Sequence, residues 1–91
     1  MDTKTTASPA QLVKGYRAKI ALDPDLYDGD LDVIMWLIED TAPRSWTPSE
    51  LGRAAKVPTT QVQNHLATLV GDGYVRTSGN GAWTRYSSAR S

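Results

Sequence analysis

Hydrophobic residues recur every three to four positions along four stretches of the chain, which is the spacing of amphipathic helices. In the first stretch, Leu12, Tyr16 and Ile20 predict a helix over 8–22. Pro24 ends that helix, because the residue before a proline is driven out of the helical region. The same spacing predicts three further helices, over 30–41, 47–56 and 59–72.

The predicted helix over 47–56 has the clearest start signal in the chain. Thr47 is a good N-terminal cap, a proline occupies the first helical position, and Glu50 completes a capping box. A brief turn then separates this helix from the longer one over 59–72. A short capped helix, a turn and a longer helix therefore follow one another.

Beyond Gly73, which is placed to end the last helix in a left-handed conformation, β-branched and aromatic residues predominate. They flank Gly79-Asn80-Gly81, so the pattern predicts a β-hairpin over 74–86, with strands over 74–78 and 82–86. Trp46 is expected on a short strand that pairs with this hairpin. Trp83 has two interpretations: packing into the core, which is favoured for an aromatic on a small sheet, or stacking on a base or sugar.

These elements predict a mainly α-helical chain with a small β-hairpin, an α+β fold. Residues 8–87 are expected to form a single domain, with tails at 1–7 and 88–91, because 91 residues leave little room for a second domain. The sequence has no cysteine, no signal-peptide pattern and no apolar run long enough to span a membrane. We therefore expect a cytoplasmic protein without disulfides.

The serial order of the elements is more specific than any one of them. Segment 51–66 combines a small-residue helix, a turn ending in valine, and a second helix with Val62 and Leu66 four residues apart. Segment 69–75 then leads through a glycine into the hairpin. Over about 31–87, the chain resembles the winged helix-turn-helix regulators, in particular their compact MarR-like and ArsR-like branches.

The resemblance implies a winged helix-turn-helix with an extra N-terminal helix, acting as a sequence-preferring, double-stranded DNA-binding transcriptional regulator, associated with the nucleoid. It places the longer helix in the major groove and the hairpin, as a wing, on the DNA backbone or minor groove. Asn and Gln pair with the adenine edge, and Thr contacts the thymine methyl group. The expected DNA-contacting residues are Thr59, Thr60, Gln61, Gln63, Asn64 and Thr68 on the longer helix, Arg53 and Lys56 on the preceding helix and turn, and Arg76, Asn80 and Arg85 in the hairpin.

Three features depart from the family pattern. Lys56 stands where glycine is common, which predicts a left-handed lysine at a cost of about 1 kcal/mol. Pro58 stands where a serine cap is common, so Thr59 is expected to cap the longer helix. The outward face of that helix has no arginine or lysine, which argues against direct guanine readout. A solvated polar face flanked by ordinary surface cations is therefore the alternative interpretation.

The net charge of zero hides an asymmetry. Residues 1–50 hold five Lys/Arg against nine Asp/Glu, whereas 51–91 hold five Lys/Arg against one Asp. An imbalance of this kind suggests that the second half faces an anionic partner, although chance produces such swings in short chains.

Candidate enzyme and metal chemistry is sparse. The acidic segment 23–30 fails the calcium-loop pattern, because Tyr27 and Ile34 fall where oxygen ligands are needed. His65 is the only histidine, so there is no zinc ligand set and no supported catalytic arrangement, and we expect it to pack. The prediction is a non-enzyme without metal, cofactor or small-molecule ligand.

Two partner questions stay open at the level of sequence. The resemblance implies a homodimer, for which the helix over 8–22 offers Leu12, Tyr16 and Ile20, but the same helix equally suits a role in covering a small core. The second function class is a winged-helix module for protein–protein interaction or assembly without DNA binding, which fits the neutral charge and the absence of arginine from the longer helix.

Overall fold

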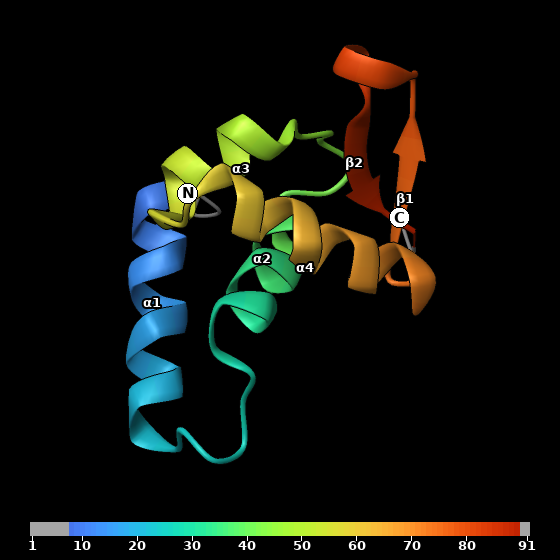
Figure 1. The fold of residues 1–91 in the computed structure, drawn as a ribbon. Coiled ribbons are helices and arrows are strands. Elements are labelled where there is room, and N and C mark those ends of the chain that lie inside the picture. Colours follow the sequence, from blue (N-terminus) through green and yellow to red (C-terminus); the bar gives the residue numbers. More distant parts are fainter. Residues whose placement is uncertain (1–7, 90–91) are drawn as a thin grey trace.

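A computed structural model describes residues 8–89 of the chain (Figure 1). Its elements, in order, are α1 (Pro9–Leu22), α2 (Gly29–Asp40), α3 (Pro48–Ala55), α4 (Thr59–Gly71), β1 (Val75–Ser78), a single 3-10 turn (Gly81–Trp83) and β2 (Arg85–Ser88). The chain is mainly helical with a small antiparallel sheet, which confirms the predicted α+β class. Each helix lies within one residue of its predicted bounds. The tail predicted at 1–7 lies outside the described residues.

The start of α3 confirms the local signal in the sequence, and α1 starts in the same way. Each begins with a capping box and a proline at its first position. At α3, the amide of Glu50 donates to Thr47 Oγ1 at 3.2 Å, and the amide of Thr47 donates to Glu50 Oε1 at 3.0 Å. These bonds satisfy two backbone donors that the helix leaves open, so the start of α3 is set by its own residues.

The α3–α4 turn depends on a left-handed residue, Lys56, and on a close backbone approach at Gly52. Lys56 is left-handed, with φ 59° and ψ 46°, as predicted. This reversal directs the amide of Val57 back to the carbonyl oxygen of Gly52, at 3.0 Å. A Cβ atom on Gly52 would lie 2.7 Å from the Val57 carbonyl oxygen, so only glycine fits without a backbone shift.

The prediction for helix α4 is wrong at its start and confirmed at its end. The expectation that Thr59 caps the helix is wrong, because Thr59 is already its first helical residue. The N-cap residue is Pro58, and no side chain makes a capping hydrogen bond there. At the other end, Gly73 is left-handed as predicted. The amide of Tyr74 then bonds to Leu69 O at 3.0 Å and that of Gly73 to Val70 O at 3.1 Å, which completes a Schellman motif.

The hairpin is present, but its second strand starts three residues later than predicted. Strand β1 pairs antiparallel with β2, with Val75 opposite Ser88 and Ser78 opposite Arg85. The predicted strand residues at 82–83 instead form the 3-10 turn, which is closed by the Thr84 amide donating to Gly81 O at 3.2 Å. Ser88, predicted as tail, is a strand residue and is 3% exposed.

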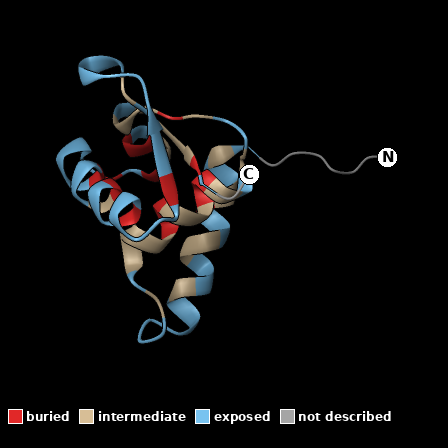
Figure 2. Cartoon of the chain, turned by 90° about the vertical axis from the view of Figure 1, so that its right-hand side faces the viewer, coloured by how far each residue is buried: buried red, intermediate tan, exposed pale blue. Residues whose placement is uncertain are grey.

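Helix α2 is the centre of the hydrophobic core, since Val33, Ile34, Leu37 and Ile38 are fully buried (Figure 2). Trp46 is also buried and forms an isolated antiparallel bridge to Tyr86, which confirms its predicted pairing with the hairpin. The full set of buried core residues is Val13, Val33, Ile34, Leu37, Ile38, Trp46, Leu51, Ala55, Val57, Val62, Leu66, Leu69 and Val75.

Helix α1 packs against this core with the residues that were considered for a dimer contact. Leu12, Tyr16 and Ile20 lie against the buried cluster. The Tyr16 hydroxyl donates to Trp36 O and to a carboxylate oxygen of Asp40, and the two aromatic rings meet edge to face. Burial and the nearby Asp40 carboxylate raise the pKa of Tyr16, so the phenol stays protonated. The apolar stripe of α1 therefore covers its own core.

Candidate nucleic-acid interface

Helix α4 presents an exposed face without charged residues, on which hydrogen-bonding side chains predominate beside Ala67 and Val70. It buries Val62, Leu66 and Leu69 against the core, which turns the opposite side to solvent. The predicted contact residues on this helix are all exposed: Thr59, Thr60, Gln61, Gln63, Asn64 and Thr68. No Asp, Glu, Lys or Arg occurs between Thr59 and Gly71. Such a face offers donors and acceptors without any fixed charge.

The two cations predicted on the helix and turn before α4 are both exposed. Arg53 is exposed on α3, and Lys56 is exposed in the turn that leads into α4. Neither side chain forms an ion pair or hydrogen bond within the part of the chain that the structure describes. Both cations are therefore available to an anionic partner.

In the hairpin, the structure separates the three predicted contact residues. Arg76 on β1 and Asn80 at the hairpin loop are exposed. Arg85 on β2 is instead held intramolecularly: its Nε donates to Ser45 Oγ at 2.9 Å, and its Nη2 lies 3.4 Å from Glu50 Oε1. Arg85 thus ties β2 to the start of α3 and is less free to bind a ligand than Arg76.

Glu50 sits at the centre of this tie. Its pKa is lowered from the ordinary value, mainly by the hydrogen bond from the Thr47 backbone amide and further by the positive charges of Arg85 and Arg44. Arg44 stacks on the Trp46 ring, with its guanidinium carbon 3.7 Å from the ring centroid. One carboxylate therefore offsets two arginines in this region.

The position of Trp83 differs from the core packing that its sequence context favoured. It is 82% exposed at the tip of the hairpin, so the expected core packing is wrong. The tip is an ordered turn, because the Trp83 amide donates to Asn80 O at 3.0 Å and Thr84 Oγ1 donates to Gly81 O at 2.8 Å. The Trp83 ring is therefore exposed to solvent on a hydrogen-bonded turn.

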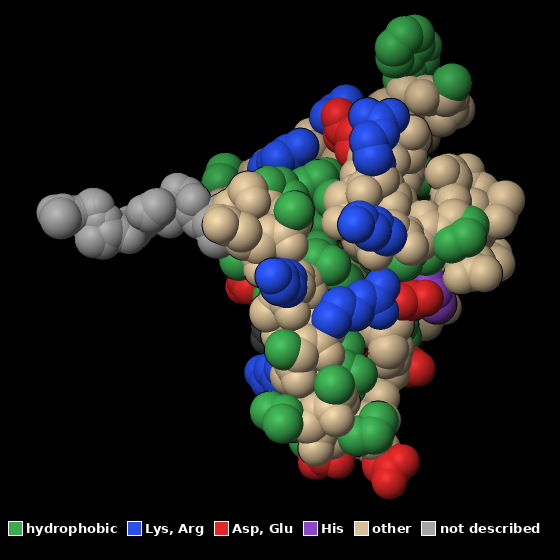
Figure 3. Space-filling model, turned by 90° about the vertical axis from the view of Figure 1, so that its left-hand side faces the viewer, with side chains coloured by type: hydrophobic (Ala, Val, Ile, Leu, Met, Phe, Trp, Pro, Cys, Tyr) green, Lys and Arg blue, Asp and Glu red, His purple; other side chains and the backbone are tan. Residues whose placement is uncertain are grey.

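Sequence reasoning missed a gathering of cations on the face formed by α1 and α3 (Figure 3). Two adjoining hollows share Ala54; one is lined in part by Arg44 and Arg53, the other by Lys14, Arg17 and Lys56. Three of these cations come from the half of the chain that is acidic overall: Lys14, Arg17 and Arg44. The available signal was the spacing of Lys14 and Arg17, three apart and therefore on one side of their helix.

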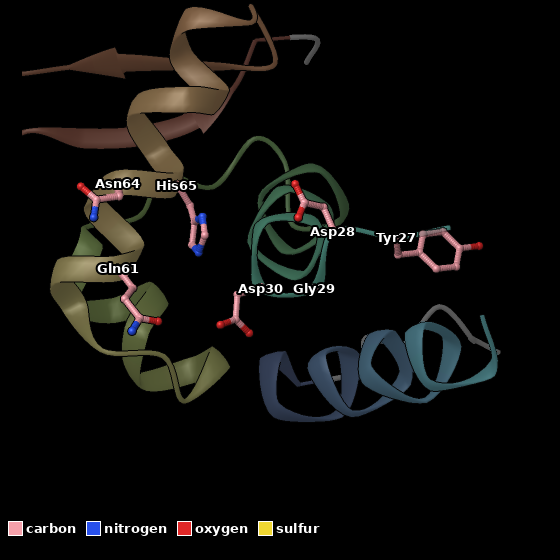
Figure 4. Close-up of a pocket in the computed structure, with 7 residues that line it drawn as sticks. All are labelled: Tyr27, Asp28, Gly29, Asp30, Gln61, Asn64 and His65. Atoms are coloured by element: carbon pink, nitrogen blue, oxygen red, sulfur yellow. The ribbon is translucent and has the colours of Figure 1, made fainter. Parts of the chain in front are cut away.

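On its other flank, α4 faces carboxylates. A hollow between α4 and the start of α2 is lined by Gln61, Asn64 and His65 on one side and by Asp28 and Asp30 on the other (Figure 4). The side chains of Gln61, His65 and Asp30 converge on this space. Asp30 is already paired with Arg17, and His65 is half-buried, in keeping with a packing role. The two flanks of α4 therefore differ in charge.

Two further properties concern the described residues as a whole. Among residues 8–89, no three His, Asp or Glu side chains lie close enough together to hold a metal ion. None of the helices in that range has both the length and the apolar character needed to cross a membrane.

Comparison with known protein families and with curated protein sequences finds no match to this chain.

Proposed function

We propose that this protein binds double-stranded DNA with a sequence preference, as a winged helix-turn-helix transcriptional regulator in the cytoplasm, rather than acting as an enzyme. In this proposal α3 and α4 are the helix-turn-helix, α4 enters the major groove, and the β1–β2 hairpin is the wing on the backbone or minor groove. The element order supports it: α2, the Trp46 bridge, α3, α4, β1 and β2 follow one another as in a winged helix.

The exposed face of α4 is the observation that carries the proposal. Surface helices ordinarily turn charged residues to solvent, whereas the exposed residues of α4 are all uncharged: threonine, glutamine and asparagine, together with Ala67, Val70 and Gly71. Asn64 lies near the middle of that face, where its amide suits the N7 and N6 groups of adenine. Thr60 and Thr68 lie one turn before and one turn after it and suit thymine methyl groups.

The surroundings of α4 supply groups suited to phosphate. Lys56 lies in the turn that leads into α4 and Arg53 is exposed on α3, both without intramolecular partners among the described residues. The amides of Thr59 and Thr60 at the first turn of the helix lack a side-chain cap, and such amides commonly bind phosphate oxygens. These contacts are independent of base identity, so they position the protein and the face of α4 selects the sequence.

A binding-site selection from random duplex DNA, followed by salt titration of the selected site, tests the proposal. We expect an enriched A/T-containing motif and a linear fall of log affinity with log salt, with a slope that reflects roughly three to six phosphate contacts. Binding that does not change with salt, or no enriched motif at low salt, would contradict the proposal.

Two substitutions separate the proposed roles. Asn64→Ala should cost about 1–3 kcal/mol on the selected site and little on random DNA, because it removes a base contact. Arg53→Ala should weaken both DNAs alike and reduce the salt slope by about one. Lys19→Ala is the matched control: it also removes one cation, but Lys19 belongs to α1 and lies over the Trp36 and Tyr27 rings. Equal losses for Asn64→Ala on both DNAs would contradict base readout.

The second candidate function is a winged-helix module that binds another protein. The acidic flank favours it, because Asp28 and Asp30 beside Gln61 and Asn64 repel phosphate. The same titration distinguishes the two functions: a protein module would show no mobility shift of duplex DNA even at low salt.

A further inference from the structure

Three exposed cations gather on one side of the molecule without a counter-charge. We call Lys14, Arg53 and Lys56 the cationic face; they belong to α1, to α3 and to the turn after α3. Lys14 and Lys56 line one hollow, Arg53 lines the next, and the two hollows adjoin on the side that Figure 3 shows. Within residues 8–89, none of the three side chains forms an ion pair or a hydrogen bond.

Arg17 holds Lys14 in this position. The Arg17 guanidinium pairs with Asp30 and donates to the carbonyl oxygen of Ala55 at 3.2 Å, which fixes α1 against the C-terminal end of α3. Lys14 comes three positions before Arg17 and therefore lies on the same side of α1. Because Arg17 is committed to its two partners, Lys14 is the cation that this side of α1 offers to another molecule.

The carboxylates that border the cationic face already have partners. Glu50 lines the same hollow as Arg53, but it accepts from the Thr47 amide and pairs with Arg85. Asp30 pairs with Arg17. Like charges that the fold holds together repel one another, so an anion that binds the cationic face relieves this repulsion.

The composition of the two hollows indicates which kind of anion fits. The large hydrophobic side chains that the described residues expose are Leu22, Leu26, Val70, Tyr74 and Trp83. None of them lines either hollow. Insertion into a lipid surface and the core of a protein–protein interface both require such side chains, whereas binding of a nucleic-acid backbone requires only cations spread over a surface.

Lys56 connects the cationic face to the candidate DNA-reading helix. It precedes Thr59, the first residue of α4, by three positions, and it lines the same hollow as Lys14. A DNA strand that borders the groove entered by the start of α4 therefore passes Lys56 and continues toward Lys14.

We propose that α1 is a second DNA-contacting element, in which Lys14 binds a backbone phosphate that flanks the bases read by α4. This inference rests on the proposed function and extends its interface to a helix that neither the sequence pattern nor the resemblance assigns to DNA. The Lys14 contact is independent of base identity, so it adds affinity and lengthens the footprint of the protein on the duplex.

Salt titration on two duplexes tests the inference. One duplex carries the selected site with roughly one helical turn of flanking DNA (~10 base pairs) on each side, and the other is trimmed to the site. On the long duplex, Lys14→Ala should weaken binding about threefold or more and reduce the salt slope by about one, because it removes one phosphate contact. On the trimmed duplex, Lys14→Ala should bind like the wild type.

Matched variants separate this contact from a general effect of charge. Lys19→Ala removes a cation from the same helix, but Lys19 lies over the Trp36 and Tyr27 rings, so it should leave binding to both duplexes unchanged. Lys14→Arg keeps the charge and should keep the slope of the wild type. Thermal unfolding should be the same for all three variants and the wild type, because Lys14 and Lys19 are exposed.

A tethered cleavage reagent locates α1 on the duplex. The sequence contains no cysteine, so Lys14→Cys provides a unique attachment point for an iron chelate that cuts the nearby DNA backbone. With the long duplex saturated, cleavage should map to the flank beside the selected motif. The same reagent on Lys19→Cys should give weaker cleavage at that position.

Three results would overturn the inference. The first is that Lys14→Ala and the wild type have equal affinity and slope on the long duplex, and the second is that Lys14→Ala loses as much affinity on the trimmed duplex. The third is unchanged duplex binding by Lys14→Glu, which would assign the cationic face to an acidic protein. Each of them leaves the proposed function standing if Asn64→Ala still loses the selected site, whereas the absence of any duplex binding at low salt overturns both proposals.

Discussion

At the scale of single residues, the α3–α4 turn depends on Gly52 and Lys56. Gly52 is required by close approach, because its missing Cβ leaves room for the Val57 carbonyl oxygen. Lys56 is a left-handed non-glycine residue, which stores strain at the point where the chain enters α4. The turn that places the candidate interface is therefore sensitive to both positions, in opposite directions.

Gly52→Ala should destabilise the fold by roughly 1–3 kcal/mol, because the new Cβ would stand 2.7 Å from backbone. Gly15→Ala is its control: Gly15 is also helical, a Cβ there meets nothing within 4 Å, and the change should stabilise by roughly 0.5–1 kcal/mol. Urea unfolding of both variants measures the difference. A destabilisation of the same size in both would show that the close approach at Gly52 has no special cost.

Lys56→Gly should stabilise the protein by about 0.5–1 kcal/mol, since glycine adopts a φ of 59° without strain. The gain is measured as a rise in the urea midpoint at unchanged slope. Lys56→Ala provides the comparison, because alanine keeps the left-handed strain; a gain of similar size in Lys56→Ala would assign the effect to the loss of charge.

At the scale of elements, β2 and α3 are joined by the Arg85–Glu50 pair and by the Thr47 capping box. Both interactions use the same carboxylate, so the position of the hairpin relative to α3 depends partly on the charge of Glu50. Arg85 was predicted to bind DNA, but its guanidinium contributes to this junction. Sequence patterns cannot distinguish the two roles, because Ser45 and Glu50 are 40 and 35 positions away from it.

The lowered pKa of Glu50 predicts a pH-dependent contribution to stability. Because the pKa in the folded state lies below the unfolded value, the contribution is complete at neutral pH and is lost as pH falls below about 4.5. Glu50→Gln should therefore lower stability by less than about 1 kcal/mol at pH 7, since the side chain is over a third exposed, and by still less at pH 3.

Thermal unfolding of wild type and Glu50→Gln at the two pH values measures this difference. A gap between the two proteins that is equal at pH 3 and pH 7 would contradict the role of the charge.

At the scale of the whole molecule, one core joins all the elements. Val13 of α1 is buried in the same cluster as Val75 of β1, with α2 between them. Trp36 lies at the α1–α2 contact and Trp46 at the contact with the hairpin, so the two indoles report on opposite sides of the molecule. We expect both regions to unfold together.

Urea unfolding followed by circular dichroism and by tryptophan fluorescence should give a single coincident transition. A Trp36→Phe variant, in which fluorescence comes from Trp46 and the exposed Trp83, should keep the two curves superimposed. A helical signal lost before the Trp46 signal would show that α1 separates from the core first.

The sequence by itself determined the features that arise from neighbouring residues. The apolar spacing of the four helices, the capping boxes at Ser8 and Thr47, and the left-handed Lys56 and Gly73 all follow from interactions a few residues apart. The exposed face of α4 could be predicted too, because a buried stripe fixes which side turns outward.

Only the tertiary structure decided where the charges and the tryptophans lie. It joined Lys14, Arg17 and Arg44 of the acidic half to Arg53 and Lys56 on one face. It also bound Arg85 to the start of α3 and turned Trp83 outward. These positions depend on which residues far apart in the sequence come into contact when the core packs. The periodicity of hydrophobic residues carries no information about such contacts. The zero net charge of the chain thus divides into cations gathered on the face of α1 and α3 and carboxylates concentrated in segment 23–30.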